Sequence, residues 1–177
     1  FTNTFLGTNS MAEYNFGKWD FGHARSMKNF ITRSAINTTV NGTTIAFENA
    51  DLTMINDCTK VQDFINIDFS DVSKFVFRNV KLSNSITTFM NNGTVSDGTN
   101  NYLFGSKLIY IDMTNTSMPG VTSFQYIAYQ PNLTSAELNG LRLDSTNTFR
   151  NIIVGDKPCT KYNYGNYFDL SITLVKT

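Results

Sequence analysis

Few side chains in this sequence could carry out catalysis or bind a metal. The 177 residues contain a single histidine, His23, and two cysteines, Cys58 and Cys159. One histidine is too few for a His-based zinc site, and no nucleophile–base pair emerges from the remaining residues. The aspartates do not follow the D-x-D-x-D-G spacing of a calcium loop. We therefore expect a protein that is not an enzyme and that needs no cofactor and no metal.

The residues best suited to bind a ligand are polar side chains in five short segments that begin near residues 11, 42, 72, 108 and 133. The segments share apolar residues at relative positions 1, 4, 6 and 9, as in "VSKFVFRNV", with Gly42 and Thr116 as weak matches. Alternate side chains of a strand point to opposite faces, so relative positions 3, 5 and 7 should share an outer face. The candidate binding residues on it are Glu13, Asn15, Glu48, Lys74, Arg78, Tyr110, Asp112, Glu137 and Asn139.

Four of these residues are the expected anchors of the site. Aromatic and arginine side chains dominate the energetics of many interfaces, which favours Tyr110 and Arg78. Asp112 and Glu137 would supply acceptors beside them. We expect a host or matrix protein, or a glycan, to bind there or at the inserted loops.

A second pattern follows each of the five segments. The pentapeptides "MKNFI", "VQDFI", "ITTFM", "FQYIA" and "FRNII" place apolar residues at positions 1, 4 and 5, the spacing of one face of a short helical turn. They start 16 residues after the segment start in the first, fourth and fifth cases. This spacing predicts short helical turns on the side opposite to the strands.

The two patterns together describe an internal repeat. "LIYIDMTNTSMPGVTSFQYIA" falls on "LTSAELNGLRLDSTNTFRNII" after a shift of 25 positions, with Leu108 on Leu133 and Phe124 on Phe149. One such unit cannot bury its own apolar face, whereas stacked units share a core. We therefore predict a single solenoid domain over 1–177, β-rich and of α/β class, with one parallel sheet of about five short strands. The longer units carry loops at 32–41 and 91–107, and an alternating segment at 166–177 should form a capping strand.

The repeat also predicts which side chains lie on one another inside the solenoid. Trp19 is expected to face the core, and both cysteines are expected to be buried thiols rather than a disulfide. The inward stacks are predicted to be Tyr14–Ile45–Phe75–Ile111–Ala136 and Phe16–Phe47–Phe77–Met113–Leu138.

Several units resemble the BspA-like leucine-rich repeats of bacterial surface proteins. "LIYIDMTNT" has Leu108, Ile111, Asp112, Met113 and Asn115 at the matching places, and "KWDFGHARSMKNFI" is similar to another part of the family pattern. The resemblance implies a leucine-rich-repeat horseshoe whose concave sheet carries the binding residues. It also implies an extracellular protein, displayed on the cell surface or secreted, that acts in adhesion and protein binding.

Charge and composition exclude some classes of partner. Lys plus Arg equal Asp plus Glu at 14 each, so the basic excess typical of nucleic-acid binding is missing. No apolar run is long enough for a membrane span, so we expect no membrane insertion. High Asn, Ser and Thr content interleaved with aromatic residues favours an extracellular protein. Because the first residue is Phe1, we also expect the chain to be a processed piece of a longer protein.

The main alternative is a right-handed parallel β-helix, as in phage tail or receptor-binding proteins and polysaccharide-degrading enzymes. "FENADL", "FRNVKL" and "LNGLRL" would suit its turns, where asparagines stack in ladders. The pentapeptide segments distinguish the two folds, since a β-helix would have a strand where a leucine-rich repeat has a helical turn. A purely structural role, as a spacer that holds another domain away from a cell wall, is a third possibility.

Overall fold

Parallel β-strands account for most of the regular structure of this chain. The computed structural model describes residues 1–7, 10–33, 42–89, 93–155 and 162–163. Within these ranges the helical segments are two short 3₁₀ turns, η1 at Val61–Asp63 and η2 at Phe69–Asp71. The chain is therefore β-rich with almost no helix, and its strands form several parallel sheets.

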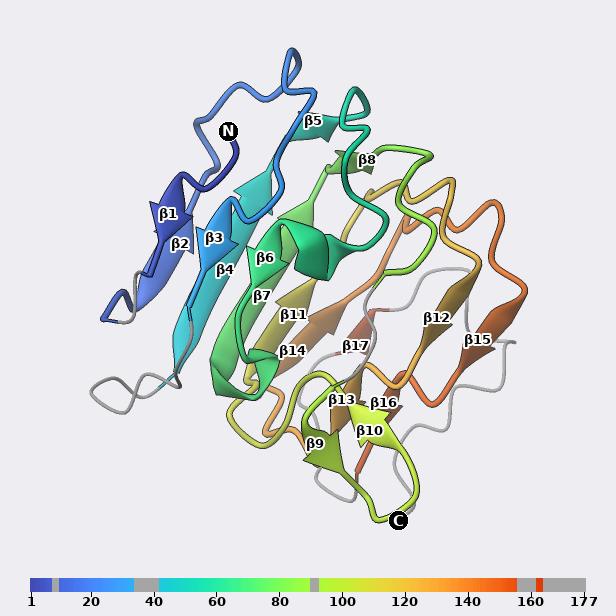
Figure 1. Ribbon diagram of the computed structural model, residues 1–177. Coiled ribbons are helices and arrows are strands. Elements are labelled where there is room, and N and C mark those ends of the chain that lie inside the picture. The colour runs from blue at the N-terminus through green and yellow to red at the C-terminus, as the bar shows by residue number, and fades with distance from the viewer. Residues whose placement is uncertain (8–9, 34–41, 90–92, 156–161, 164–177) are drawn as a thin grey trace.

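The largest sheet contains six parallel strands in the order β17-β14-β11-β7-β4-β2 (Figure 1). The prediction that the five short segments form strands of one parallel sheet, in chain order, is confirmed, and β17 adds a sixth strand. The strand bounds are Glu13–Asn15 (β2), Thr43–Glu48 (β4), Val72–Arg78 (β7), Tyr110–Asp112 (β11), Ser135–Glu137 (β14) and Tyr162–Asn163 (β17).

The strands pair in the predicted register. The chain of paired residues runs from Tyr14 through Ile45, Phe75 and Ile111 to Ala136, and all five side chains are buried. In the second predicted stack, β4 and β7 pair Phe47 with Phe77. Its other members are buried as well, namely Phe16, Met113 and Leu138. A shift of one residue would have turned the apolar side chains to the other face, so the apolar pattern itself specifies this register.

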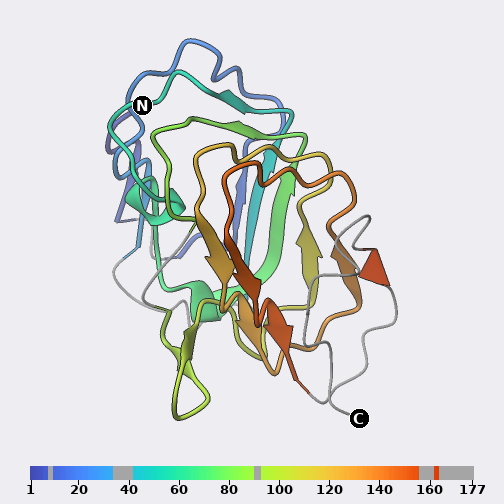
Figure 2. The ribbon, with the colours of Figure 1, turned by 90° about the vertical axis from the view of Figure 1, so that its right-hand side faces the viewer.

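The remaining strands form smaller sheets. Four of these sheets are parallel: β1 (Phe5–Leu6) with β3 (Ile31–Thr32) and β6 (Ile65–Asn66), β5 (Asp51–Leu52) with β8 (Lys81–Leu82), β12 (Ser123–Gln125) with β15 (Thr148–Arg150), and β13 (Ala128–Tyr129) with β16 (Ile153–Val154). The antiparallel pair β9 (Val95–Ser96) and β10 (Asn101–Tyr102) is a hairpin inside the second inserted loop. Figure 2 shows β12 and β15 opposite β11 and β14, with the chain looping between them.

The prediction of short helical turns after each strand is wrong for most of the described segments. "FQYIA" and "FRNII" contain β12 and β15, and "MKNFI" ends in β3. A helical turn is present in "VQDFI", as η1. The spacing 1, 4, 5 places apolar side chains on one face of a helical turn, but a short strand that bends at its end satisfies it equally well. No helix in the described part of the chain is long and apolar enough to cross a membrane.

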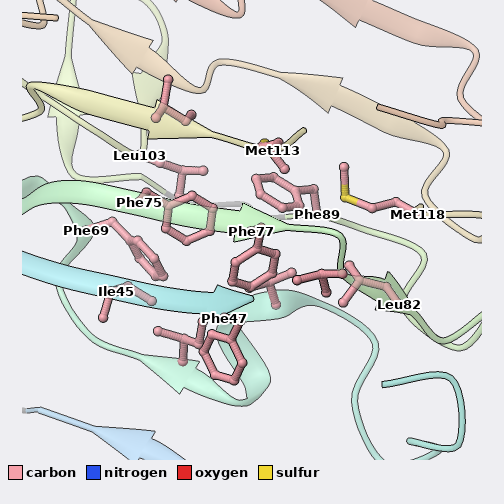
Figure 3. Packing of buried hydrophobic residues seen from close by; sticks show 14 of the residues in the cluster. Ile45, Phe47, Phe69, Phe75, Phe77, Leu82, Phe89, Leu103, Met113 and Met118 are labelled. Atoms are coloured by element: carbon pink, nitrogen blue, oxygen red, sulfur yellow. The ribbon is translucent and has the colours of Figure 1, made fainter. Parts of the chain in front are cut away.

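Phenylalanine side chains fill much of the space between the sheets. Figure 3 shows Phe75 and Phe77 on β7 pointing into the same buried cluster as Phe47 from β4. The rings of Phe75 and Phe77 are stacked with centroids 4.6 Å apart, and Phe77 meets Phe47 edge-on at 5.4 Å. These contacts tie neighbouring strands together through their side chains as well as through their backbones.

Asparagines at the ends of three neighbouring strands form a ladder. Asn49, Asn79 and Asn115 all adopt left-handed backbone conformations, with φ of 57°, 54° and 54°. The Asn79 Nδ2 donates to Asn49 Oδ1 at 2.9 Å, and the Asn115 Nδ2 donates to Asn79 Oδ1 at 3.3 Å. Gly140, with φ of 73°, lies against the Asn115 side chain, and a Cβ there would collide with Asn115 Oδ1. The turn thus requires a residue that tolerates positive φ, which asparagine and glycine do best.

Asn79→Ala should lower the free energy of unfolding by about 1–2 kcal/mol, because alanine is strained at positive φ and the two amide bonds of the ladder are lost. Asn79→Gly loses the same bonds but relieves the backbone, so it should cost less than Asn79→Ala. Chemical denaturation followed by tryptophan fluorescence measures both values. Equal costs for the two variants would mean that the backbone conformation contributes nothing.

Three further predictions concern Trp19, the two cysteines and the capping strand. The prediction that Trp19 faces the core is wrong: the residue is 39% exposed, although its ring still contacts Phe16 and Phe21. Cys58 is buried and unbridged, as expected, and burial raises the pKa of its thiol to about 12. Cys159 and the predicted capping strand at 166–177 lie outside the described residues.

Candidate functional site

The candidate binding residues lie on the six-stranded sheet or just past its strand ends, at positions that alternate with the side chains of the apolar core. Strand pairing aligns Glu13, Lys74 and Tyr110 along one row across the sheet. The second row begins at Asn15, continues through the apolar residues Ala46 and Val76, and ends with Asp112 and Glu137. A third row pairs Glu48 with Arg78 and continues past the strand ends toward Asn139. We call the side chains of these three rows the outer face.

Arg78 is the centre of a hydrogen-bonded network on the outer face. Its Nε and Nη2 donate to Asp112 Oδ2 at 3.0 and 2.6 Å, and its Nη1 donates to Glu48 Oε2 at 3.3 Å. The Tyr110 hydroxyl donates to the same Asp112 oxygen at 2.9 Å and lies 3.3 Å from Arg78 Nη2. The structure therefore brings together four residues from three adjacent strands, β4, β7 and β11.

Asp112 holds this network in place. Asp112 is only 2% exposed. Its second carboxylate oxygen, Oδ1, accepts a hydrogen bond from the backbone N–H of Thr114 at 2.9 Å. Burial by itself would raise the pKa of Asp112, but the hydrogen bonds from the Thr114 backbone and from Arg78 outweigh burial and lower it. The carboxylate is thus ionised at neutral pH and fixes the guanidinium of Arg78.

The same network changes the pKa of its other two titrating members. The hydrogen bond to Asp112 and the negative charge of that carboxylate raise the pKa of Arg78. Burial, followed by the hydrogen bond to Asp112, raises the pKa of the Tyr110 hydroxyl. Arg78 therefore stays cationic and Tyr110 stays protonated at neutral pH. Both are unsuited to act as a base there, whereas both can donate hydrogen bonds.

The other candidate residues lie outside this network. Asn15 Nδ2 donates to Glu13 Oε1 at 3.2 Å on the edge strand β2, where both side chains are exposed. Glu137 is 9% exposed, and its Oε1 accepts the Ser135 hydroxyl at 3.2 Å. Lys74 and Asn139 are exposed. The outer face therefore carries one tight cluster, an acidic edge and several separate polar groups.

The accessible part of the cluster consists of donors and acceptors in fixed positions. The Arg78 side chain is 42% exposed and that of Glu48 is 33% exposed, whereas Asp112 is covered. A ligand on this face would meet the guanidinium edge, the Glu48 carboxylate and the Tyr110 side chain. Such groups recognise hydroxyls, amides and amines through hydrogen bonds.

Sequence reasoning missed a buried ionic cluster at the start of the strands. Arg33 Nη2 lies 2.7 Å from Asp71 Oδ2, and both side chains are fully buried. The Thr43 hydroxyl and the Lys107 ammonium also bond to the Asp71 carboxylate, at 3.0 and 2.6 Å. Asp71 and Lys107 each come directly before one of the apolar segments that form neighbouring strands. These opposite charges at equivalent positions of two segments were the feature of the sequence from which an ion pair could have been predicted.

Within the described ranges, no three His, Cys, Asp or Glu side chains gather so that they could hold a metal ion. Searches of protein-family models, curated proteins and solved structures find no match to this chain. The functional assignment therefore depends on the geometry of the outer face.

Proposed function

We propose that the parallel sheets are the walls of one β-solenoid, closer to a parallel β-helix than to a leucine-rich repeat. Strands rather than helical turns occupy "FQYIA" and "FRNII", which is the feature that distinguishes the two folds. The ladder of Asn49, Asn79 and Asn115 supports the same choice. Membership of the BspA-like family stays a prediction.

We further propose that the chain is a non-enzymatic binding module that acts outside the cell or on its surface, with a host or matrix protein or a glycan as its partner. The observation that carries this proposal is the fixed network of Arg78, Asp112, Tyr110 and Glu48 on the outer face. Side chains that are already held in their binding geometry lose little conformational entropy when a ligand arrives. Asp112 acts in this proposal as a positioning residue, and Arg78, Tyr110 and Glu48 contact the ligand.

A binding array tests this proposal. The purified protein is applied to immobilised polysaccharides and extracellular-matrix proteins, and the array is repeated with the double variant Tyr110→Ala with Arg78→Ala. Loss of a charge-assisted hydrogen bond and an aromatic anchor should reduce binding by about tenfold or more. Both side chains point away from the core, so circular dichroism should show an intact fold. The melting temperature should fall, because the buried Asp112 carboxylate loses the Arg78 and Tyr110 donors.

Lys81→Ala is the matched control, because Lys81 is an exposed cation on β8, outside the outer face. This control should bind as the unaltered chain does. Equal binding by the double variant, together with loss of binding when the β9–β10 hairpin is deleted, would place the site on the inserted loop instead. Cleavage of an arrayed polysaccharide would support an enzyme of the β-helix kind and overturn the non-enzymatic proposal.

A further inference from the structure

We infer that the ligand of the outer face is a neutral polysaccharide chain, not an anionic one, which names the ligand class of the proposed function and depends on that function. Three observations carry the inference: the balance of charge on the outer face, the kinds of side chain on it, and the spacing between neighbouring positions within its rows.

The outer face has more negative than positive groups. It carries four carboxylates, namely Glu13, Glu48 and the largely buried Asp112 and Glu137, against two cations, Lys74 and Arg78. The charge of Arg78 is already opposed by Asp112 at 2.6 Å and by Glu48 at 3.3 Å. A uronic-acid or sulfated polymer would bring further negative charge onto this surface, and like charges brought together oppose binding. The charge therefore selects against anionic chains.

The side chains of the outer face suit a sugar better than a protein. Stable protein interfaces usually have a core of large apolar or aromatic groups. The large hydrophobic residues that are exposed in the described chain are not members of the three rows, namely Phe1, Leu6, Trp19, Met54 and Ile109. Within the rows, Tyr110 is the one aromatic residue. Carboxylates and guanidinium groups, in contrast, can each bond to two neighbouring hydroxyls of a sugar ring.

Neighbouring positions within a row repeat at a distance that suits a polymer of sugars. Neighbouring strands of a sheet lie about 4.7–4.9 Å apart, a distance comparable to the length of one hexose in an extended chain. Glu48 and Arg78 are direct neighbours across β4 and β7, and Tyr110 lies on the next strand. A polysaccharide that runs across the strands along the first row would thus meet a new polar group at each sugar, whereas the second row is interrupted by Ala46 and Val76.

Affinity electrophoresis tests the inference with defined probes. The protein is run in native gels that contain a neutral β-glucan, hydroxyethylcellulose or the anionic polygalacturonate. We expect the neutral polymers to retard the protein at polymer concentrations about tenfold lower than polygalacturonate does, at low ionic strength. The variant Glu13→Gln with Glu48→Gln removes two carboxylates from the outer face, so it should gain retardation by polygalacturonate.

The matched control is Asp51→Asn with Asp144→Asn, which removes two exposed carboxylates outside the outer face. This control should not gain binding to polygalacturonate. Stronger retardation of the unaltered protein by polygalacturonate, weakening with added salt, would overturn the inference. If no polysaccharide retards the protein while an arrayed matrix protein binds it through Tyr110 and Arg78, the inference fails and the proposed function stands. Binding that is unaffected by the Tyr110 and Arg78 changes would contradict the proposed function itself.

Discussion

Asp71→Asn should lower the free energy of unfolding at pH 7 by about 3–5 kcal/mol, the range found when one partner of a buried ion pair is removed. Asp71 and Arg33 are both fully buried, and the Nε of Arg33 already has no hydrogen-bond partner. The amide of asparagine keeps the shape of the carboxylate but not its charge. The guanidinium would then stay buried without a counterion, which is the source of the cost. Urea denaturation at pH 7 measures the change.

Two controls distinguish the cost of leaving a buried charge without a counterion from the cost of losing an ion pair. Asp144→Asn removes the partner of Arg142 in an exposed pair, and it should change stability by no more than about 1 kcal/mol. Replacing Arg33 by Met together with Asp71 by Leu removes both buried charges, and it should cost much less than Asp71→Asn alone. Lys107 is partly exposed and can turn to solvent in that variant. A full cost in the double variant would show that the pair is stabilising in its own right.

The effect of acid gives an independent measure of the same cluster. Burial acts to raise the pKa of Asp71, but the hydrogen bonds from Lys107 and Thr43 and the charge of Arg33 outweigh it and lower the pKa. A carboxyl whose pKa is lower in the folded than in the unfolded state stabilises the fold above its unfolded value of about 3.9. That stabilisation is lost as the pH falls through the folded pKa. The melting temperature of the unaltered protein should therefore fall below about pH 4 more steeply than that of the Asp71→Asn variant.

Phe77→Ala should lower the free energy of unfolding by about 3–5 kcal/mol, as large-to-small changes in a close-packed core do. Phe77 is fully buried, stacks on Phe75 within β7 and contacts Phe47 on β4. Its backbone carbonyl also accepts the Thr116 hydroxyl, so the neighbouring chain cannot easily move in to fill the space. Chemical denaturation measures the loss. A change no larger than that of a surface variant such as Lys81→Ala would place Phe77 outside the core.

A graded series sharpens this result. Phe77→Leu keeps most of the apolar volume and leaves a smaller cavity, so it should cost clearly less than Phe77→Ala. If the two variants cost the same, loss of ring contacts rather than cavity volume would determine the effect. Phe75→Ala should behave like Phe77→Ala, because the two rings share one stack.

The strands of the main sheet and their register could be read from the sequence, because period-2 alternation leaves only one way to bury the apolar side chains. Tyr14, Ile45 and Phe75 are aligned as the apolar positions required. The second pattern was ambiguous for a physical reason. Apolar residues at positions 1, 4 and 5 can share one face of a helical turn, and they can equally be buried by a short strand and its bend. Parallel pairing with the neighbouring segment made Phe124 part of a strand, and local sequence does not contain that partner.

The candidate site shows the same division. Alternation alone placed Glu48, Arg78 and Tyr110 on the outer face, because their neighbours in the sequence had to point inward. The sequence could not determine that Asp112 would be covered and would hold Arg78, because those two residues are 34 positions apart and meet through strand pairing. The buried pair of Arg33 and Asp71 likewise exists only in the folded chain, where 38 residues of sequence separation become one salt bridge. Side-chain periodicity is a local property that the sequence determines, whereas charge partners depend on which strands become neighbours, and only the tertiary structure decides that.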